Sequence, residues 1–305
     1  MNKDKIRNSF WGEFLISCLH IVECKVLPKV MDDETAVKKF FKKKAGYDLN
    51  LDNPRTYSEK LNWYKLNARN PLMAQCADKV AVREYVTEKG YGDMLNEIYG
   101  VYDKVSEIDI DALPEQFVLK AAHGSHMNLI VTDKSKINWR QQKMLMSTWL
   151  KQDIYWSGRE WVYKDLPKRI VAEKYLEDES GELKDYKFFC FNGKAEYMEY
   201  DTGRFCGIHY RNFYDENMKF VPIDDGCPND ETISLPISKE QFDKMKSIAN
   251  DLSQPFLFAR IDFYSLGDKL LFGEITFFDS GGFEFFNPKE YDYEFSKNWE
   301  LIKNP

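Results

Sequence analysis

The stretch FARIDFYSLGDKLLFGEITFFDSGGFEFFNP at residues 258–288 constrains the fold of this chain more than any other part of its sequence. It contains two apolar runs separated by a short polar turn, which predicts an antiparallel β-hairpin. Side chains alternate between the two faces of a strand. We therefore expect one face of the hairpin to carry four polar side chains, Arg260 and Asp262 from the first strand and Glu274 and Thr276 from the second.

Two carboxylates that converge beside an arginine suit a divalent cation that carries phosphate oxygens. The alternative is a half-buried hairpin with ordinary polar residues on its wet face. That alternative leaves unexplained why two acids and an arginine lie among Phe, Ile and Leu. The next turn, Ser280-Gly281-Gly282, is either a tight structural turn or a set of backbone N–H groups that can bind an anion.

The composition indicates a folded protein without general affinity for nucleic acid. The 305 residues suffice for one large domain or for two to three subdomains. Hydrophobic residues make up 43% and charged residues 30% of the chain, which excludes global disorder. The net charge of −7 argues against nucleic-acid binding. The six cysteines form no CxxC pair, so we expect neither a zinc site nor a disulfide framework, and scattered thiols are typical of a reducing cytoplasm.

The first 46 residues predict two helices, at residues 8–27 and 34–46. The first is apolar at helical spacing, and the second carries five lysines. No uncharged run approaches the roughly 18 residues of a membrane span, and charged residues also exclude a signal peptide. A packed helix and a solvated basic face are the default interpretation. The alternative is contact with a partner, an anionic polymer or a bilayer surface. We expect a cytoplasmic protein, which would be peripheral at the inner face of the membrane if these helices contact a bilayer.

The rest of the chain predicts a mixed α+β fold with antiparallel hairpins late in the sequence. Helices are expected at 57–71, 77–89, 138–152 and 238–252. Strands are expected at 95–102, 116–122, 128–132 and 169–176, with a hairpin at 186–200. Asn192-Gly193 at the turn of that hairpin is a strong local signal.

Several polar residues in the first half of the chain could bind phosphate. Lys79 lies near the start of the helix predicted at 77–89. Lys120 ends an apolar strand, and the segment 123–128, HGSHMN, follows at once; Gly124-Ser125 in it could cover phosphates with backbone N–H groups. The P-loop and Rossmann fingerprints are absent. An ordinary loop explains HGSHMN equally well.

Further charges follow in the second half. Glu173 comes at a strand end, where free backbone groups at Lys174 and Tyr175 could hydrogen-bond a purine. Lys187 opens the hairpin at 186–200. A predicted loop rich in Tyr and Phe carries Arg204, His209 and Arg211. Each of these residues alone is more often a surface charge or an ordinary strand end, and only their order along the chain indicates a site.

Seven phrases between about residue 55 and residue 290 carry a resemblance to a known family. They are YSEKLNWYKL, ADKVAVREYV, LPEQFVLKAAHGSHMN, VAEKYL, DYKFFCFNGK, FARIDFY and FGEITFFDSGGFEFFNP. In these phrases the chain resembles the ATP-grasp proteins, and more specifically their TupA-like branch. That branch is named for teichuronopeptide biosynthesis and is often found among polysaccharide-biosynthesis genes.

The resemblance implies an ATP-grasp fold, in which two α+β subdomains grip ATP between antiparallel sheets. It divides the chain into a helical N-terminal region at 1–75, a small subdomain with the glycine flap at 76–170 and a large subdomain with the metal-binding hairpin at 171–305. ATP and Mg²⁺ are the implied cofactors.

The resemblance also implies roles for individual residues. The contacts to ATP would come from Lys79, Lys120, Gly124, Ser125, Glu173, Lys174, Tyr175 and Lys187. Lys187 and Arg260 would act at the phosphates, and the metal ligands would be Asp262, Glu274 and Thr276. Many ATP-grasp enzymes have Asn where this chain has Thr276. From charge and location, the acceptor carboxylate would be held by Arg204, His209 and Arg211.

The implied activity is that of an ATP-dependent carboxylate–amine ligase. A carboxylate attacks the γ-phosphate of ATP, and an amine then displaces phosphate from the acyl-phosphate to give an amide. This chemistry needs positioning and charge neutralisation rather than a nucleophilic Ser or Cys. The expected partners are a uronic-acid-containing cell-surface polysaccharide, or its precursor, and an amino acid or similar amine.

Two other classes of protein remain open. A glycosyltransferase would use a D-x-D pattern to bind a nucleotide-sugar metal, and Asp109-Ile110-Asp111 has that pattern within an acidic connector. A solvated loop explains it more simply. The other class is a non-catalytic polysaccharide-binding protein on the same fold. The presence of the lysines and acids named above argues against a loss of catalytic function.

Overall fold

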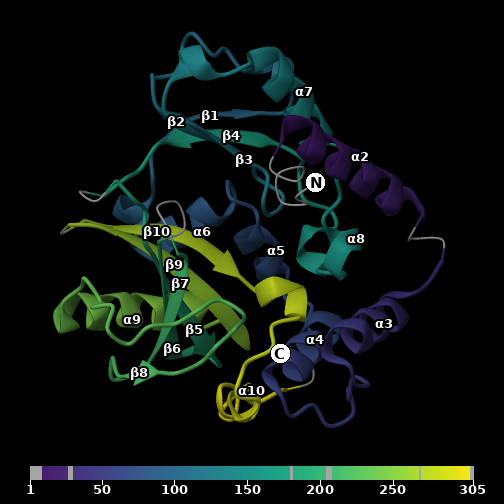
Figure 1. The fold of residues 1–305 in the computed structure, drawn as a ribbon, viewed down its shortest axis with the longest axis vertical. Helices are drawn as coiled ribbons and strands as arrows, with labels where there is room; N and C mark the ends of the chain where they lie inside the picture. The colour runs from purple at the N-terminus through teal and green to yellow at the C-terminus, as the bar shows by residue number, and fades with distance from the viewer. Residues whose placement is uncertain (1–8, 27–29, 179–180, 204–207, 268, 303–305) are drawn as a thin grey trace. The chain divides into compact units, whose positions relative to one another are not determined.

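The computed structural model describes residues 9–26, 30–178, 181–203, 208–267 and 269–302. Within them the predicted α+β class is confirmed, because helices accompany two antiparallel sheets (Figure 1). The chain forms two compact units, each built from separate segments. Unit 1 comprises Met1–Ala36, Asp78–Ala81 and Asn96–Tyr175, and unit 2 comprises Val37–Ala77, Val82–Leu95 and Leu176–Pro305.

Unit 1 is built on a four-stranded antiparallel sheet in the order β1-β4-β2-β3. The strands are β1 (Ile98–Tyr102), β2 (Phe117–Ala121), β3 (Asn128–Val131) and β4 (Ile170–Lys174). Helix α7 (Trp139–Trp149) covers one face, where Phe117 and Leu119 pack with Leu145 and Met146. Unit 1 also contains α2 (Phe10–Val26), α8 (Tyr155–Gly158) and the 3₁₀ turns η3 (Val105–Glu107), η4 (Lys134–Lys136) and η5 (Trp161–Tyr163).

Unit 2 is built on a six-stranded antiparallel sheet in the order β10-β9-β5-β6-β7-β8. Its strands are β5 (Asp185–Phe191), β6 (Lys194–Thr202), β7 (Tyr210–Asp215), β8 (Phe220–Val221), β9 (Phe258–Leu266) and β10 (Lys269–Thr276). Helix α9 (Lys239–Ser253) begins with a capping box between Ser238 and Gln241. It packs on one face of the sheet, with the rings of Phe188 and Phe242 5.4 Å apart.

The opposite face of this sheet is covered by aromatic side chains and by α4 (Tyr57–Asn67). Helix α4 begins with a capping box in which Thr56 and Glu59 satisfy each other's backbone N–H groups. The Tyr57 ring is fully buried and lies within 6.4 Å of the rings of Phe189 and Phe258. Unit 2 also contains α5 (Pro71–Ala77), α6 (Val82–Glu88), η2 (Gly92–Met94), η6 (Asp279–Gly282) and α10 (Glu290–Glu294). Helix α3 (Asp33–Ala45) spans the boundary between the two units.

Two local predictions differ from the structure. The helix predicted at 77–89 is divided, because the Asp78 carboxylate accepts the backbone N–H groups of Val80 and Ala81 and forms a turn before α6. The segment of Arg211, predicted as a loop, is strand β7, which pairs with β6. Of the N-terminal region, residues 1–36 belong to unit 1 and residues 37–77 to unit 2; the division into a helical region and two subdomains stays a prediction.

The pKa of Asp292, a buried acid in α10, lets us predict how the stability of the folded protein depends on pH. The Asp292 side chain is 3% exposed, and burial, with the nearby Glu59 carboxylate, raises its pKa to about 7. The unfolded chain has a lower pKa for Asp of about 3.9, so the folded state loses stability as pH rises from about 4 to 7.

We therefore expect Asp292→Asn to be more stable than the wild type at pH 8 by about 2–4 kcal/mol, at roughly 1.4 kcal/mol per pKa unit. The gain should shrink toward zero near pH 4. Chemical denaturation at pH 5 and pH 8 measures it, with the exposed Asp52→Asn as the matched control. An equal gain at both pH values would contradict the pKa assignment.

Candidate active site

The hairpin of β9 and β10 gathers the four polar residues singled out in the sequence. Asp262 lies opposite Glu274, and Arg260 lies opposite Thr276. Hydrogen bonds and ion pairs among the four side chains show that they share one face. This arrangement depends on a β-bulge between Phe272 and Glu274, which shifts the register by one residue.

Glycine at the bulge is required by the approach of the neighbouring strand. A Cβ atom on Gly273 would lie 2.9 Å from the backbone oxygen of Asp262. That distance is shorter than van der Waals contact, and a backbone atom cannot move aside easily. Gly273 therefore lets the two strands stay close where both acids lie.

We expect Gly273→Ala to destabilise the protein by about 1–3 kcal/mol, as overpacking does in cores. It should also disturb the spacing of the Asp262 and Glu274 carboxylates. Chemical denaturation and Mg²⁺-dependent ATP binding measure the two effects. Lys269→Ala, at an exposed position of the same hairpin, is the control, and wild-type stability of Gly273→Ala would contradict the predicted clash.

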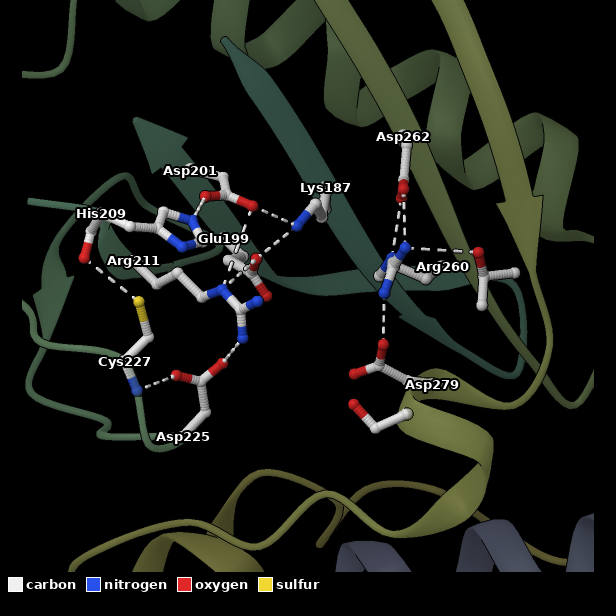
Figure 2. A network of polar contacts seen from close by, with 12 residues as sticks. Lys187, Glu199, Asp201, His209, Arg211, Asp225, Cys227, Arg260, Asp262 and Asp279 are labelled. Carbon is white, nitrogen blue, oxygen red and sulfur yellow. Dashed lines mark hydrogen bonds and ion pairs between the residues drawn. The ribbon is translucent and has the colours of Figure 1, made fainter. Parts of the chain in front are cut away.

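Arg260 is the centre of this part of the site (Figure 2). Its Nε and Nη2 atoms donate to the two oxygens of Asp262 at 2.8 and 2.7 Å. Its Nη1 atom bonds to Asp279, just beyond the hairpin. Nη2 also donates to the Thr276 hydroxyl at 3.3 Å and lies 3.5 Å from Glu274. One guanidinium thus holds both strands and the following turn.

The same residues fit a divalent cation. Burial raises the pKa of Asp262 to about 7, and repulsion from Glu274 contributes, although Arg260 opposes the shift. Carboxylate oxygens have lone pairs for more than one partner, and Mg²⁺ is commonly held by one or two carboxylates plus phosphate. Within the described residues no group of three or more His, Cys, Asp or Glu forms a metal site.

A second positively charged side chain, that of Lys187, lies next to Arg260 on the same sheet face. Lys187 of β5 is opposite Asp262 in the register and is 7% exposed. Its Nζ donates to Glu199 at 2.6 Å and to Asp201 at 2.7 Å, both on β6. Burial opposes the charged form of Lys187, but these carboxylates raise its pKa above the usual value. Lys187 is therefore protonated at neutral pH.

Arg211 of β7 and His209, which directly precedes that strand, extend the network (Figure 2). Arg211 bonds to Asp225 and lies 3.7 Å from Glu199, and His209 bonds to Asp201. Arg211 was predicted, with His209 and Arg204, to hold an acceptor carboxylate. In the structure carboxylates of the protein itself surround Arg211. Arg204 lies outside the described residues.

This face of the sheet has an excess of negative charge. Six carboxylates and three arginine or lysine cations make up the network: Glu199, Asp201, Asp225, Asp262, Glu274 and Asp279 with Lys187, Arg211 and Arg260. The difference is three negative charges when all groups are ionised. A polyphosphate could approach such a face only together with metal cations.

The turn after the hairpin has an unusual backbone and is held from α4. Ser280, Gly281 and Gly282 all have positive φ, of 47°, 65° and 84°. Asn62 donates to the Gly282 carbonyl at 2.6 Å, and Lys65 donates to the Gly281 carbonyl at 2.5 Å. The Gly281 N–H donates to the Phe278 carbonyl at 2.9 Å, as in a tight structural turn, and anion binding by the other N–H groups of the turn stays a prediction.

In unit 1, Lys120 and Glu173 form an ion pair, with 2.8 Å between Nζ and Oε2. They lie on neighbouring strands, β2 and β4. The free strand edge expected at Lys174 is not present, because β4 is an inner strand of its sheet. The Lys174 N–H donates to the Glu97 carbonyl, and its own carbonyl accepts from Asn96. Direct contact of these groups with a purine stays a prediction.

The connection between β2 and β3 contains the predicted flap. Its base is anchored by His123, which is 2% exposed and lies 3.1 Å from the Trp149 carbonyl. A Cβ atom on Gly124 would lie 2.6 Å from the Ile154 side chain and 2.7 Å from the Met127 side chain, so a larger residue there would require both side chains to move. Lys79 is brought to the same place, since its backbone N–H donates to the Ala122 carbonyl. Lys79, Lys120 and the flap thus belong to one region of unit 1.

The D-x-D pattern is part of an exposed turn. The Asp109 carboxylate accepts the backbone N–H groups of Asp111 and Ala112. This is the local turn-forming use of aspartate, which agrees with the simpler explanation given for this segment.

Sequence reasoning missed several members of the network. Glu199 and Asp201 lie two residues apart on β6, a spacing that places both on one face, and this signal was available in the sequence. Asp225 and Asp279 lie outside strands, and Asn62 and Lys65 lie on a distant helix. Their contacts are set by tertiary folding alone.

Comparison with protein families gives one match that spans most of the chain. The model of the family described as TupA-like ATPgrasp matches residues 59–299. No significant match to a curated protein was found.

Solved structures with a similar fold are distant in sequence. D-alanine–D-alanine ligase from Bacillus anthracis is 19% identical with a TM-score of 0.39, over 66% of this chain and 56% of that chain. An ADP complex of N5-carboxyaminoimidazole ribonucleotide synthetase is 11% identical with a TM-score of 0.45, over 72% and 50%. D-alanine–D-alanine ligase from Helicobacter pylori is 11% identical with a TM-score of 0.44, over 80% and 69%. The chain spans about half the length of the first two.

Proposed function

Because this chain belongs to the TupA-like ATP-grasp family, which its match over residues 59–299 shows, we propose that it is an ATP-dependent carboxylate–amine ligase. The observation that carries the proposal is the buried charge network of unit 2. Arg260 and Lys187 lie among carboxylates on one sheet face, with Asp262 directly opposite Glu274. A site of this kind suits a nucleotide polyphosphate and its metal ions.

Mg²⁺ is the cation that we assign to Asp262 and Glu274. When bound there it would supply positive charge against the phosphate oxygens. Thr276 contacts both Arg260 and Glu274 through its hydroxyl, at 3.3 Å in each case. We therefore assign Thr276 first to orienting these two side chains and second to ligation of the metal.

The positive side chains are assigned to the phosphates. Lys187 and Arg260 are held rigidly by buried acids, so both would offer a fixed positive charge to the transferring phosphoryl group. We also assign Lys79 and Lys120, with Gly124 and Ser125 of the flap, to phosphate binding. The adenine is assigned to Glu173 and to the chain at Lys174 and Tyr175.

The proposed reaction has two steps. A carboxylate oxygen of the first substrate attacks the γ-phosphorus of ATP, and ADP leaves. A neutral amine then attacks the acyl carbon, and phosphate leaves as the amide forms. The residues described above position the reactants and balance developing charge, which is the main source of catalysis in phosphoryl transfer.

For the substrates, we propose a uronic-acid-containing cell-surface polysaccharide or its precursor, as in teichuronopeptide or capsule formation, with an amino acid or similar amine. The support for this class is the TupA-like family. A carboxylated sugar supplies the acid. Arg204 stays a candidate for the acceptor carboxylate.

An ADP-release screen tests this proposal. The purified protein is incubated with Mg-ATP, a panel of uronic-acid oligosaccharides and a panel of amino acids, and products are identified by mass spectrometry. We expect ADP release that requires both substrates, with an amide product. A phosphorylated glycan would assign a kinase instead. Binding of a UDP-sugar without binding of Mg-ATP in calorimetry would favour a glycosyltransferase.

A further inference from the structure

Glu284 is a buried acid of unit 2 that lies beside the charge network. It is 8% exposed, and the Ser280 hydroxyl donates to its carboxyl group. Its backbone is also fixed, because the Ser58 hydroxyl of α4 donates to the Glu284 carbonyl. Asp279, which precedes the same turn, bonds to Arg260 (Figure 2). One short segment thus bonds to Arg260 through its first acid and holds a second acid, Glu284, inside the protein.

The surroundings of Glu284 favour its protonated form. Burial raises the pKa of Glu284 to about 8, and the carboxylates of Asp279, Asp225 and Glu199 contribute to the rise, which the hydrogen bond from Ser280 opposes. These three acids lie on η6, on the connection between β8 and α9, and on β6. A carboxyl group whose pKa lies near the working pH can take a proton from a reacting group and release it again.

The Tyr57 hydroxyl lies near the same charges and has no hydrogen-bond partner among the described residues. Tyr57 is the first residue of α4 and is fully buried. The charged side chains that act on its hydroxyl are those of Asp279, Arg260, Glu284 and Glu199. The hydroxyl therefore points from α4 toward the charge network. A buried hydroxyl without a partner destabilises a folded protein, and phenylalanine would fill the same space without that cost. The hydroxyl thus suits a polar ligand at this position.

An ammonium group is the ligand that this position suits best. It only donates hydrogen bonds, and both the Tyr57 hydroxyl and the Glu284 carboxylate can accept them. A carboxylate or phosphate at the same place would be repelled by the acids around it. Arg260 would not offset that repulsion fully, because its guanidinium already donates to acids on either side, Asp262 and Asp279.

We propose that Glu284 is the general base that deprotonates the incoming amine, and that the Tyr57 hydroxyl holds this amine beside it. The inference rests on the proposed function, because the amine is the second substrate of that reaction. It adds a residue for the proton that the amine must lose.

The step balances as follows. The ammonium group of the substrate transfers one proton to the ionised Glu284 carboxylate and becomes a neutral amine. Its nitrogen forms a bond to the acyl carbon, and the bond from that carbon to the phosphate oxygen breaks. Phosphate leaves with the electron pair and takes the second proton from the nitrogen. Glu284 then releases its proton to the solvent.

Two nucleophiles test the role of Glu284. Uronic-acid oligosaccharides and Mg-ATP are incubated either with the amino-acid panel or with hydroxylamine, which is mostly unprotonated at neutral pH and converts an acyl-phosphate to a hydroxamate. Glu284→Gln should form the amide about 10²–10⁴-fold more slowly than the wild type, the usual contribution of a general base, and the hydroxamate within about threefold of the wild-type rate. Gln preserves the shape and the neutral form of the side chain, so the fold should persist.

Asp292→Asn is the matched control. Asp292 is also a buried acid of unit 2 with a raised pKa, but its charged neighbours are Glu59 and Lys289. This variant should form both products at the wild-type rate.

Tyr57→Phe tests the position of the amine. We expect a KM for the amino acid about 3–10-fold higher, as for one lost hydrogen bond, with kcat nearly unchanged. The midpoint of chemical denaturation should not fall, because the hydroxyl has no partner among the described residues. Lower stability with an unchanged KM would show that the hydroxyl is only structural.

The outcomes separate this inference from the ligase assignment. Unchanged amide formation by Glu284→Gln would overturn the role of Glu284 as a base. Equal loss of the amide and the hydroxamate would also overturn it, because the defect would then precede the amine. If the wild type forms neither product, the ligase assignment itself is wrong, and this inference falls with it.

Discussion

Glu274→Gln is expected to reduce substrate-dependent ADP release by about 10²–10³-fold, which is the usual cost of removing one electrostatic contact to a transition state. The change removes one negative charge beside Asp262 and Arg260, where we assign Mg²⁺. Gln keeps the shape of the side chain but loses the charge that holds a divalent cation. Mg²⁺-dependent binding of a non-hydrolysable ATP analogue, measured by calorimetry, should weaken together with turnover.

The fold of this variant should be intact. The Glu274 side chain is 42% exposed, and its charge opposes that of Asp262 across the two strands. Unfolding should therefore occur at the same denaturant concentration as in the wild type, or slightly higher. Glu240→Gln, an exposed acid of α9, is the matched control. Full activity and unchanged Mg²⁺ dependence in Glu274→Gln would exclude Glu274 as a metal ligand.

The hairpin that carries Glu274 shows how far sequence reasoning reaches. Alternation along each strand correctly paired Arg260 with Asp262 and Glu274 with Thr276. Whether the two pairs share a face depends on the register between the strands. With regular pairing from the two-residue connection, the register would differ by one residue, and the two pairs would lie on opposite faces. The bulge at Gly273 corrects that shift, and its glycine is the only sequence sign of it.

The hairpin of β5 and β6 shows the limit of the same reasoning. Its Asn192-Gly193 turn was predicted, and the observed strands end at Phe191 and begin at Lys194. Regular pairing from that turn would place Lys187 opposite Met198. A register shift between Phe189 and Cys190 places it opposite Glu199 instead. The partners of Lys187 could not be predicted, because nothing local marks the shift.

Contacts between segments far apart in the chain could not be predicted from the sequence for a different reason. Helix α4 was predicted, but most of its residues are buried, polar ones included, so its sequence does not say which surface it covers. Lys65 and Asn62 meet the turn at Gly281 and Gly282 more than 200 residues later in the chain. The glycines and the helix each signal their own conformation, and only the folded unit brings them together.

Lys187→Met is expected to destabilise the protein by about 3–5 kcal/mol, the cost of breaking a buried ion pair by removing one partner. Glu199 and Asp201 are 3% and 2% exposed, and both would lose their nearest cation, at 2.6 and 2.7 Å. The same change should abolish turnover, because Lys187 is assigned to the transferring phosphoryl group. Chemical denaturation and ADP release measure the two effects.

The double variant Lys187→Met/Glu199→Gln separates stability from catalysis. It removes one cation and one carboxylate, so the charge balance of the network is restored and much of the lost stability should return. Turnover should not return, since no other cation of the described network can replace an ammonium group at that position. Recovery of turnover together with stability would show that Lys187 only balances the buried acids, and the phosphate contact would then belong to Arg260.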